Sequence, residues 1–157
     1  MRRILTACIA VLFTATATVA DMDAGYDAID RGDWAAALRE LLPHAAEGDP
    51  RAQVHVGYLY ANGLGTAEDA AEAAFWWDQA AAAGDSDGQF FLAGLYFDGV
   101  GLLRDREMAA FWYRAAAEQG DPDAQYYLAL QYETGDGVPR DDDEAARWMR
   151  QAAEQGH

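Results

Sequence analysis

The sequence predicts an all-α protein, an α/α superhelical solenoid made of antiparallel helix pairs. One junction phrase recurs three times, as EGDPRAQ, AGDSDGQ and EQGDPDAQ, with its glycines 36 residues apart at Gly48, Gly84 and Gly120. Self-similarity at such a period is the signature of stacked repeats. Apolar residues recur at helical spacing between the junctions, and the β-branched residues that strands favour are scarce after residue 20.

The first twenty residues differ in kind from the rest. Arg2 and Arg3 precede an apolar run from Ile4 to Phe13, and small residues follow as far as Ala20. This is the layout of a secretory signal peptide. The apolar run is too short to cross a bilayer in the mature chain. We therefore expect cleavage after Ala20 and a periplasmic or secreted product.

Two alternatives to this processing stay open. In one, the leader remains attached as a helix at the membrane interface. In the other, Leu5-Thr6-Ala7-Cys8 acts as a lipoprotein cleavage box and Cys8 carries a lipid. Only seven residues precede Cys8 and the apolar run continues beyond it, so the box is misplaced. If Cys8 leaves with the leader, the mature chain has no cysteine and hence no disulfide and no thiol nucleophile.

The part of the chain after residue 20 is strongly acidic. It carries nine arginines, no lysine and 27 acidic residues. Phosphate groups are bound by clustered cations, so such a surface repels nucleic acid and anionic lipid. No phosphate loop or dinucleotide fingerprint is present, and we expect no cofactor. Any charged partner should be neutral or basic where it docks.

Residues 21–157 are expected to form a single repeat domain. Its first unit, 21–47, is a short helix pair in which Gly32 stops one helix and Asp33 caps the next. Trp34 and Leu38 then begin the apolar face of the second helix. Three full units follow, at 48–83, 84–119 and 120–156.

Each full unit opens on the same device. Gly120 suits the left-handed conformation that ends a helix, and Asp121 can accept the free backbone N–H groups of the next helix. Pro122 fits the first helical position, where its missing N–H costs nothing. Gly48-Asp49-Pro50 repeats the device and Gly84-Asp85-Ser86 varies it. Turns this short force neighbouring helices to pack antiparallel.

A second glycine pair divides each unit into two helices, as at Gly135-x-Gly137, and an aspartate such as Asp141 then opens the second helix. The run from Asp141 to Glu144 lacks the ligand spacing and central glycine of a calcium loop, so we interpret it as a solvated helix start and expect no metal. Helices are expected at 22–31, 33–46, 50–62, 67–83, 86–98, 104–119, 122–134 and 141–155.

The third full unit resembles a known family. From Ala124 to Gly156 it reads A-Q-x-x-L-A-x-x-Y-x-x-G-x-G-V-x-x-D-x-x-x-A-x-x-W-x-x-x-A-A-x-x-G, which is similar to the Sel1-like repeat (SLR), a relative of the tetratricopeptide repeat. All three full units match at the glycines, the Tyr, the Trp and the paired Ala, and the leading unit resembles a tetratricopeptide unit. Departures are mild: Gly57 keeps the family's usual small residue, whereas Ala93 and Ala129 replace it.

The resemblance implies an adaptor or scaffold, often of the bacterial envelope and in some cases regulatory, with a concave surface lined by first helices. An apolar, aromatic groove with an acidic rim suits an extended or helical peptide with apolar anchors and basic residues. For each groove position, an ordinary core role is the alternative. Transfer of the tetratricopeptide pattern implies a partner-binding groove of Val54, Tyr58, Phe90, Phe97, Tyr126 and Leu130, with Asp87, Asp98, Asp123 and Glu133 beside it.

The alternative function is an envelope hydrolase or a protein that binds cell-wall glycan or β-lactam. Some cysteine-rich secreted relatives have been associated with β-lactams, but cysteine pairs pin their repeats. Ser86 is the only serine, and His44, His55 and His157 show no metal-ligand spacing. A nucleophile with a base therefore has few candidates, while a glycan-cleaving carboxylate pair stays open. We expect a non-catalytic protein.

The last predicted helix carries Trp148 and Met149 and has no capping helix after it. Terminal repeats need a polar outer face. We therefore expect partly exposed apolar surface at this end, and self-association through the uncapped C-terminal helix.

Overall fold

The computed structural model describes residues 21–156, so the expected signal peptide and its cleavage site lie outside the described residues. Within that range the chain forms α-helices and no strand, which confirms the all-α class. The helices are α1 (Met22–Asp30), α2 (Trp34–Ala46), α3 (Pro50–Ala61), α4 (Ala70–Ala82), α5 (Ser86–Asp98), α6 (Arg106–Glu118), α7 (Pro122–Thr134) and α8 (Asp142–Glu154).

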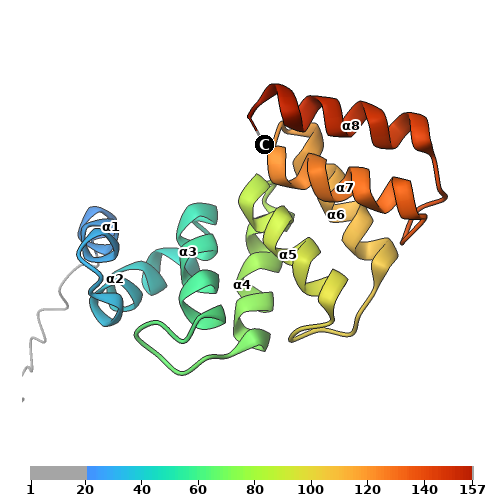
Figure 1. Ribbon diagram of the computed structural model, residues 1–157. Coiled ribbons are helices and arrows are strands. Elements are labelled where there is room, and N and C mark those ends of the chain that lie inside the picture. The colour runs from blue at the N-terminus through green and yellow to red at the C-terminus, as the bar shows by residue number, and fades with distance from the viewer. Residues whose placement is uncertain (1–20, 157) are drawn as a thin grey trace, which may run out of the picture.

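The helices stack in chain order. Each packs chiefly against its neighbours in the sequence, and α3 also contacts α5 across one repeat. Figure 1 shows the hairpins following one another along a curved, elongated stack. The predicted α/α solenoid is therefore confirmed. Since α4, α6 and α8 each follow an antiparallel partner, these second helices point the same way along the stack, while their axes turn progressively from α4 to α8 (Figure 1).

The junctions have the geometry predicted for them. The backbone at Gly48, Gly84 and Gly120 is left-handed, with φ of 98°, 91° and 98°. The following aspartates are the N-caps of α3, α5 and α7. Their carboxylates accept hydrogen bonds from Ala52, Gly88 and Ala124 N–H at 2.8, 2.9 and 2.7 Å.

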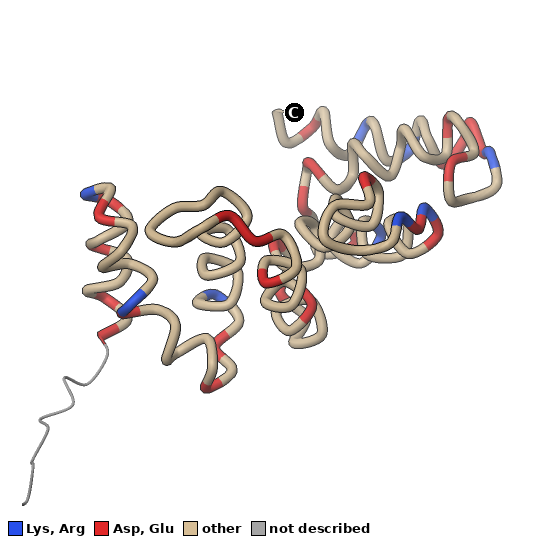
Figure 2. Tube along the Cα trace, turned by 90° about the horizontal axis from the view of Figure 1, so that it is seen from below, with Lys and Arg blue, Asp and Glu red and all other residues tan. Residues whose placement is uncertain are grey.

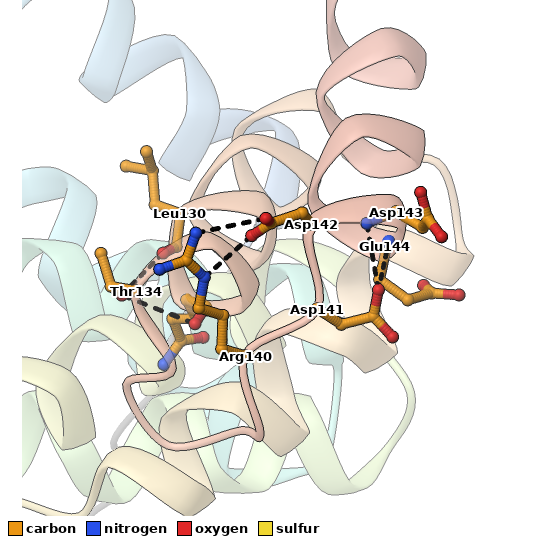
Figure 3. Close-up of polar contacts among 8 residues, drawn as sticks. Leu130, Thr134, Arg140, Asp141, Asp142, Asp143 and Glu144 are labelled. Atoms are coloured by element: carbon orange, nitrogen blue, oxygen red, sulfur yellow. Dashed lines mark hydrogen bonds and ion pairs between the residues drawn. The ribbon is translucent and has the colours of Figure 1, made fainter.

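The second helices start later than predicted. The starts expected at 67, 104 and 141 fall at Ala70, Arg106 and Asp142. The reason is the aspartate before each start, which has an extended backbone and is the N-cap. Figure 3 shows the last of these, where Asp141 accepts hydrogen bonds from the Asp143 and Glu144 backbone N–H groups, both at 3.0 Å. Asp142 instead pairs with Arg140 at 2.9 Å.

The second glycine of each mid-unit pair holds successive repeats together closely. A methyl group on Gly137 would lie 2.0 Å from the Arg106 carbonyl oxygen at the start of α6. The same contact recurs between Gly101 and Ala70, at 2.3 Å. These glycines are therefore needed because of the neighbouring repeat as well as for their left-handed backbone.

The core is rich in alanine and carries a buried glutamine in each full unit. Gln53, Gln89 and Gln125 are between 4% and 6% exposed. Their side-chain amides donate to carbonyl oxygens in the last turn of the preceding helix, at 3.0, 3.4 and 3.1 Å. Each of these carbonyl oxygens also accepts the backbone N–H of the junction glycine, at 3.0 to 3.1 Å, so the glutamine is a second donor that ties the two helices together at the junction.

The expectation of an exposed apolar end is wrong for Trp148. Its side chain is 5% exposed and packs into the cluster formed with Ala93, Tyr113 and Leu128. The tryptophan at this repeat position points back towards the preceding unit, as Trp76 does towards Leu41 and its neighbours, so it needs no later helix to cover it. Met149 is partly buried against the same cluster.

Candidate partner-binding groove

The first helices share one open cavity of about 510 Å³. It runs from α1 and the start of α2, across α3 and α5, to the start of α7. Its lining residues are Ile29, Trp34, Val54, His55, Tyr58, Leu59, Asp87, Phe90, Phe91, Asp121 and Asp123. We call this cavity the groove.

Three of the six residues transferred from the tetratricopeptide pattern line the groove. Tyr58 is 45% exposed and presents its ring to solvent, whereas Val54 is only 7% exposed. Phe90 is half-buried and stands 5.5 Å from Phe91, ring centre to ring centre, in an edge-on arrangement. These residues come together because α3 and α5 lie side by side.

The other three lie outside this cavity, Phe97 on α5 and Tyr126 and Leu130 on α7. The Arg106 guanidinium covers Phe97, 3.5 Å from the centre of its ring. Tyr126 is half-buried and stands edge-on to Tyr127, with ring centres 5.6 Å apart. Leu130 is also half-buried, one turn before the end of α7.

The groove also contains a row of residues that the transferred pattern omits. His55 and Phe91 occupy the same repeat position on α3 and α5, and both line the cavity. The equivalent Tyr127 on α7 is 39% exposed, stacks on Tyr113 at 5.4 Å and lies 6.1 Å from Phe90. The signal was present in the sequence, since aromatic rings recur 36 residues apart at this position.

Carboxylates form one rim of the groove. Asp87, Asp121 and Asp123 line it, while Asp98 and Glu133 do not. Burial raises the pKa of Asp121, and the charges of Asp123 and Asp87 raise it further. The hydrogen bond from Ala124 N–H opposes this rise. Figure 2 shows acidic residues along much of the chain and few basic ones.

His55 stands between the aromatic and the charged parts of the groove. Its ring lies edge-on to Tyr26 of α1, with ring centres 5.1 Å apart. Burial lowers the pKa of His55, and the Arg51 charge lowers it too, against opposing effects of Asp87 and Asp85. The imidazole therefore favours its neutral form.

Three other features of residues 21–156 concern metal binding, membrane spans and the serine. That range holds no group of three or more His, Cys, Asp and Glu side chains arranged to bind a metal ion. None of its helices is both long and apolar enough to span a membrane. Ser86 is the first residue of α5 and does not line the groove.

A stack of glycine-punctuated helix hairpins with an apolar groove along its first helices defines a solenoid repeat protein of the interaction-module class. The chain belongs to the Sel1 repeat family, whose family profile matches residues 50–85, 86–121 and 122–157. These matches begin two residues after the junction glycines. Sel1 repeat proteins are generally protein-interaction modules, and their fold is typically a non-catalytic scaffold.

Solved structures of this family resemble the chain. A Sel1 repeat protein from Oxalobacter formigenes is 33% identical, with a TM-score of 0.83 over 87% of this chain and 56% of that protein. The protective antigen c5321 of uropathogenic Escherichia coli strains, which displays an SLR fold, is 34% identical, with a TM-score of 0.82 over 87% of this chain and 30% of the antigen. This chain thus spans about half or less of either protein.

A more distant structure shares the fold alone. Cysteine rich protein B of Helicobacter pylori is 18% identical, with a TM-score of 0.64 over 78% of this chain and 91% of that protein. A comparison with curated proteins finds no match.

Proposed function

We propose that this protein is a non-catalytic interaction module of the bacterial cell envelope that binds a protein or peptide in the groove. The observation that carries the proposal is the 510 Å³ cavity, which combines apolar walls from α1, α3 and α5 with carboxylates on α5 and at the start of α7. Pockets that bind peptides are predominantly apolar and contain a few placed polar groups.

The chemistry of the groove describes its partner. The exposed ring of Tyr58 and the half-buried ring of Phe90 offer apolar contact area. Aromatic residues often dominate binding energies. No ion pair among residues 21–156 involves Asp87, so its carboxylate can receive a partner's cation. A segment with an apolar anchor next to arginine or lysine fits both features.

Site-specific crosslinking tests the groove directly. A photoreactive amino acid at Tyr58 should capture a partner in the native envelope, while one at Arg39, whose side chain is 70% exposed on α2, should not. Capture from Tyr58 should be lost when Phe90→Ala is added. A folded Phe90→Ala variant that retains every partner would overturn the assignment of the groove.

Envelope location is proposed from the leader alone. Mass spectrometry of the exported protein should find Asp21 as the new N-terminus, because the small residues end at Ala20. A cytoplasmic, uncleaved product would contradict export, and a lipidated Cys8 would mean that the exported protein is anchored to a membrane.

The non-catalytic assignment has its own test. Turnover of cell-wall fragments or of a β-lactam by the purified protein would overturn it in favour of the hydrolase alternative.

A further inference from the structure

The second helices α4 and α6 present exposed aromatic residues outside the groove. Phe75 is 52% exposed and Phe111 is 58% exposed, and they occupy the same position in successive repeats. Each stands edge-on to the tryptophan that follows it, with ring centres 4.9 Å apart. Leu103, just before α6, is 91% exposed.

The repeat does not require apolar residues at these positions. The third full unit has Arg147 where the others have phenylalanine, and its guanidinium lies 4.3 Å from the Trp148 ring centre. Pro139 stands where the second unit has Leu103. Because the same hairpin forms with a charged residue, folding alone does not account for Phe75 and Phe111.

The clefts beside these helices place the aromatic and charged residues on one outer surface. Phe75, Asp78 and Tyr96 line a cleft of about 310 Å³. One repeat later, Arg114 and Arg147 line a cleft of about 490 Å³ with Tyr132 and Trp148. In the second cleft, Arg114 and Arg147 lie on either side of Tyr132. The residues 36 positions earlier are Asp78, Phe111 and Tyr96. We therefore place Asp78 and Phe111 on either side of Tyr96.

Equivalent outward positions on α4 and α6 are complementary. Where α4 carries Phe75, α6 carries Phe111, and Asp78 corresponds to Arg114. In the turns before the helices, Glu68 corresponds to Arg104. The other outward positions, 36 residues apart on α4 and α6, bring no two like charges together. These pairs are Ala71/Glu107, Glu72/Met108, Gln79/Ala115 and Ala82/Glu118. The N-caps Asp69 and Asp105 share a sign, but their carboxylates accept backbone N–H groups.

The neighbouring pair of second helices shows the opposite pattern. Compared position by position, α6 and α8 carry like charges four times, at Arg104/Arg140, Glu107/Asp143, Arg114/Arg150 and Glu118/Glu154. A surface formed by α6 and α8 would repel a copy of itself. Complementarity is therefore specific to the surface of α4 and α6.

We propose that this surface binds a second copy of the chain around a two-fold axis. Because α4 and α6 point the same way along the stack, a two-fold axis that lies between them and follows their mean direction places α4 of one copy across α6 of the other. Rotation about such an axis keeps each residue at its height along the axis. Phe75 of each copy then meets Phe111 of the other, and Asp78 meets Arg114, so that every contact occurs twice.

The residues concerned are available for this pairing. No ion pair within residues 21–156 involves Glu68, Asp78, Arg104 or Arg114. Arg114 donates to the Tyr132 hydroxyl and lies 5.6 Å from that ring centre, so its present partner is neutral. Burial of four phenylalanine rings favours association, and the charge pairs select the register.

Charge exchange tests the interface. Sedimentation of the mature chain should show a concentration-dependent dimer that weakens at high salt. Asp78→Arg and Arg114→Asp should each weaken dimerisation about tenfold or more by opposing like charges, and the double variant should restore it. Phe111→Arg should abolish the dimer. Circular dichroism should show unchanged helix content throughout.

Controls on α8 separate this surface from the chain's end. Arg150→Asp is the matched charge change outside the proposed interface and should leave the dimer intact. A dimer lost with Met149→Arg but retained with Phe111→Arg would place self-association at α8 and overturn the proposal. Monomers at every concentration, or failure of the double variant to recover, would also overturn it.

Discussion

The indole ring of Trp77 lies directly against the Cα of Gly57. A methyl group at Gly57 would come within 2.5 Å of Trp77 Nε1, and this nitrogen donates a 3.1 Å hydrogen bond to the Val54 carbonyl oxygen. The residues at these two positions change together from repeat to repeat. The first full unit pairs Gly57 with Trp77, the second pairs Ala93 with Tyr113 and the third pairs Ala129 with Met149. The smallest residue therefore faces the largest ring.

Gly57→Ala should destabilise the protein by about 1–3 kcal/mol, the usual range for forcing extra volume into a packed core. Adding Trp77→Tyr reproduces the pair that the next repeat uses and should recover most of that loss. Urea denaturation of the single and double variants measures the coupling. If the two effects simply add, the close contact is not what constrains Gly57.

Ala83→Gln should stabilise the protein. The Gln119 amide donates to Gln89 Oε1 at 2.8 Å, and Gln155 donates to Gln125 Oε1 at 3.0 Å. The first full unit has Ala83 at this position, and the Oε1 atom of Gln53 is buried without a partner.

A glutamine at position 83 can supply the missing donor, which should add about 1 kcal/mol to the free energy of unfolding. Thermal and urea denaturation check this. Ala82→Gln, one residue away and exposed, is the matched control. Since glutamine has a lower helix propensity than alanine, equal gains from both substitutions would show that the gain does not come from a donor to Gln53 Oε1.

Gly137→Ala should destabilise the protein far more than Gly120→Ala. Both glycines have positive φ, but only a methyl at Gly137 would meet backbone, whereas nothing lies within 4 Å at Gly120. Left-handed backbone alone costs an alanine about 1–2 kcal/mol. The contact with the Arg106 carbonyl should raise the loss at Gly137 to about 3 kcal/mol or more, and similar losses at both sites would contradict it.

His55 should make stability depend on pH. Because burial lowers the His55 pKa in the folded protein, the unfolded chain binds more protons in the window that extends downward from about pH 6.5. The His55 contribution to stability is therefore present above that window and is lost as the pH falls through it. His55→Phe, which copies Phe91 of the next repeat, should lack this component.

The measurement is the difference in unfolding free energy between wild type and His55→Phe from pH 7.5 to 5. As the pH falls, the free energy of unfolding of the wild type should decrease more than that of His55→Phe. Parallel curves would show that the imidazole is not desolvated.

Helix positions could be predicted closely because their signals are local. Glycine stops and aspartate caps lie within a few residues of the helix ends they define. The error at the start of α4 came from treating 67–69 as helical, although Asp69 is the cap and must be extended to accept from Ala71 and Glu72 N–H.

The groove could be predicted only in part. Val54, Tyr58 and Phe90 line one cavity, because first helices do present that face. Phe97 has the same aromatic character, but the Arg106 guanidinium covers its ring. That contact joins α5 to the beginning of α6 and has no counterpart in the transferred pattern.

By itself, the sequence determined the all-α class, the 36-residue period and the order of helices, since caps, stops and apolar spacing act over short stretches of chain. Tertiary structure alone decided which aromatic side chains are buried and which stay in solvent. Trp148 is buried while Phe111 is exposed, because burial depends on residues one repeat away that fill or leave open the space around each ring.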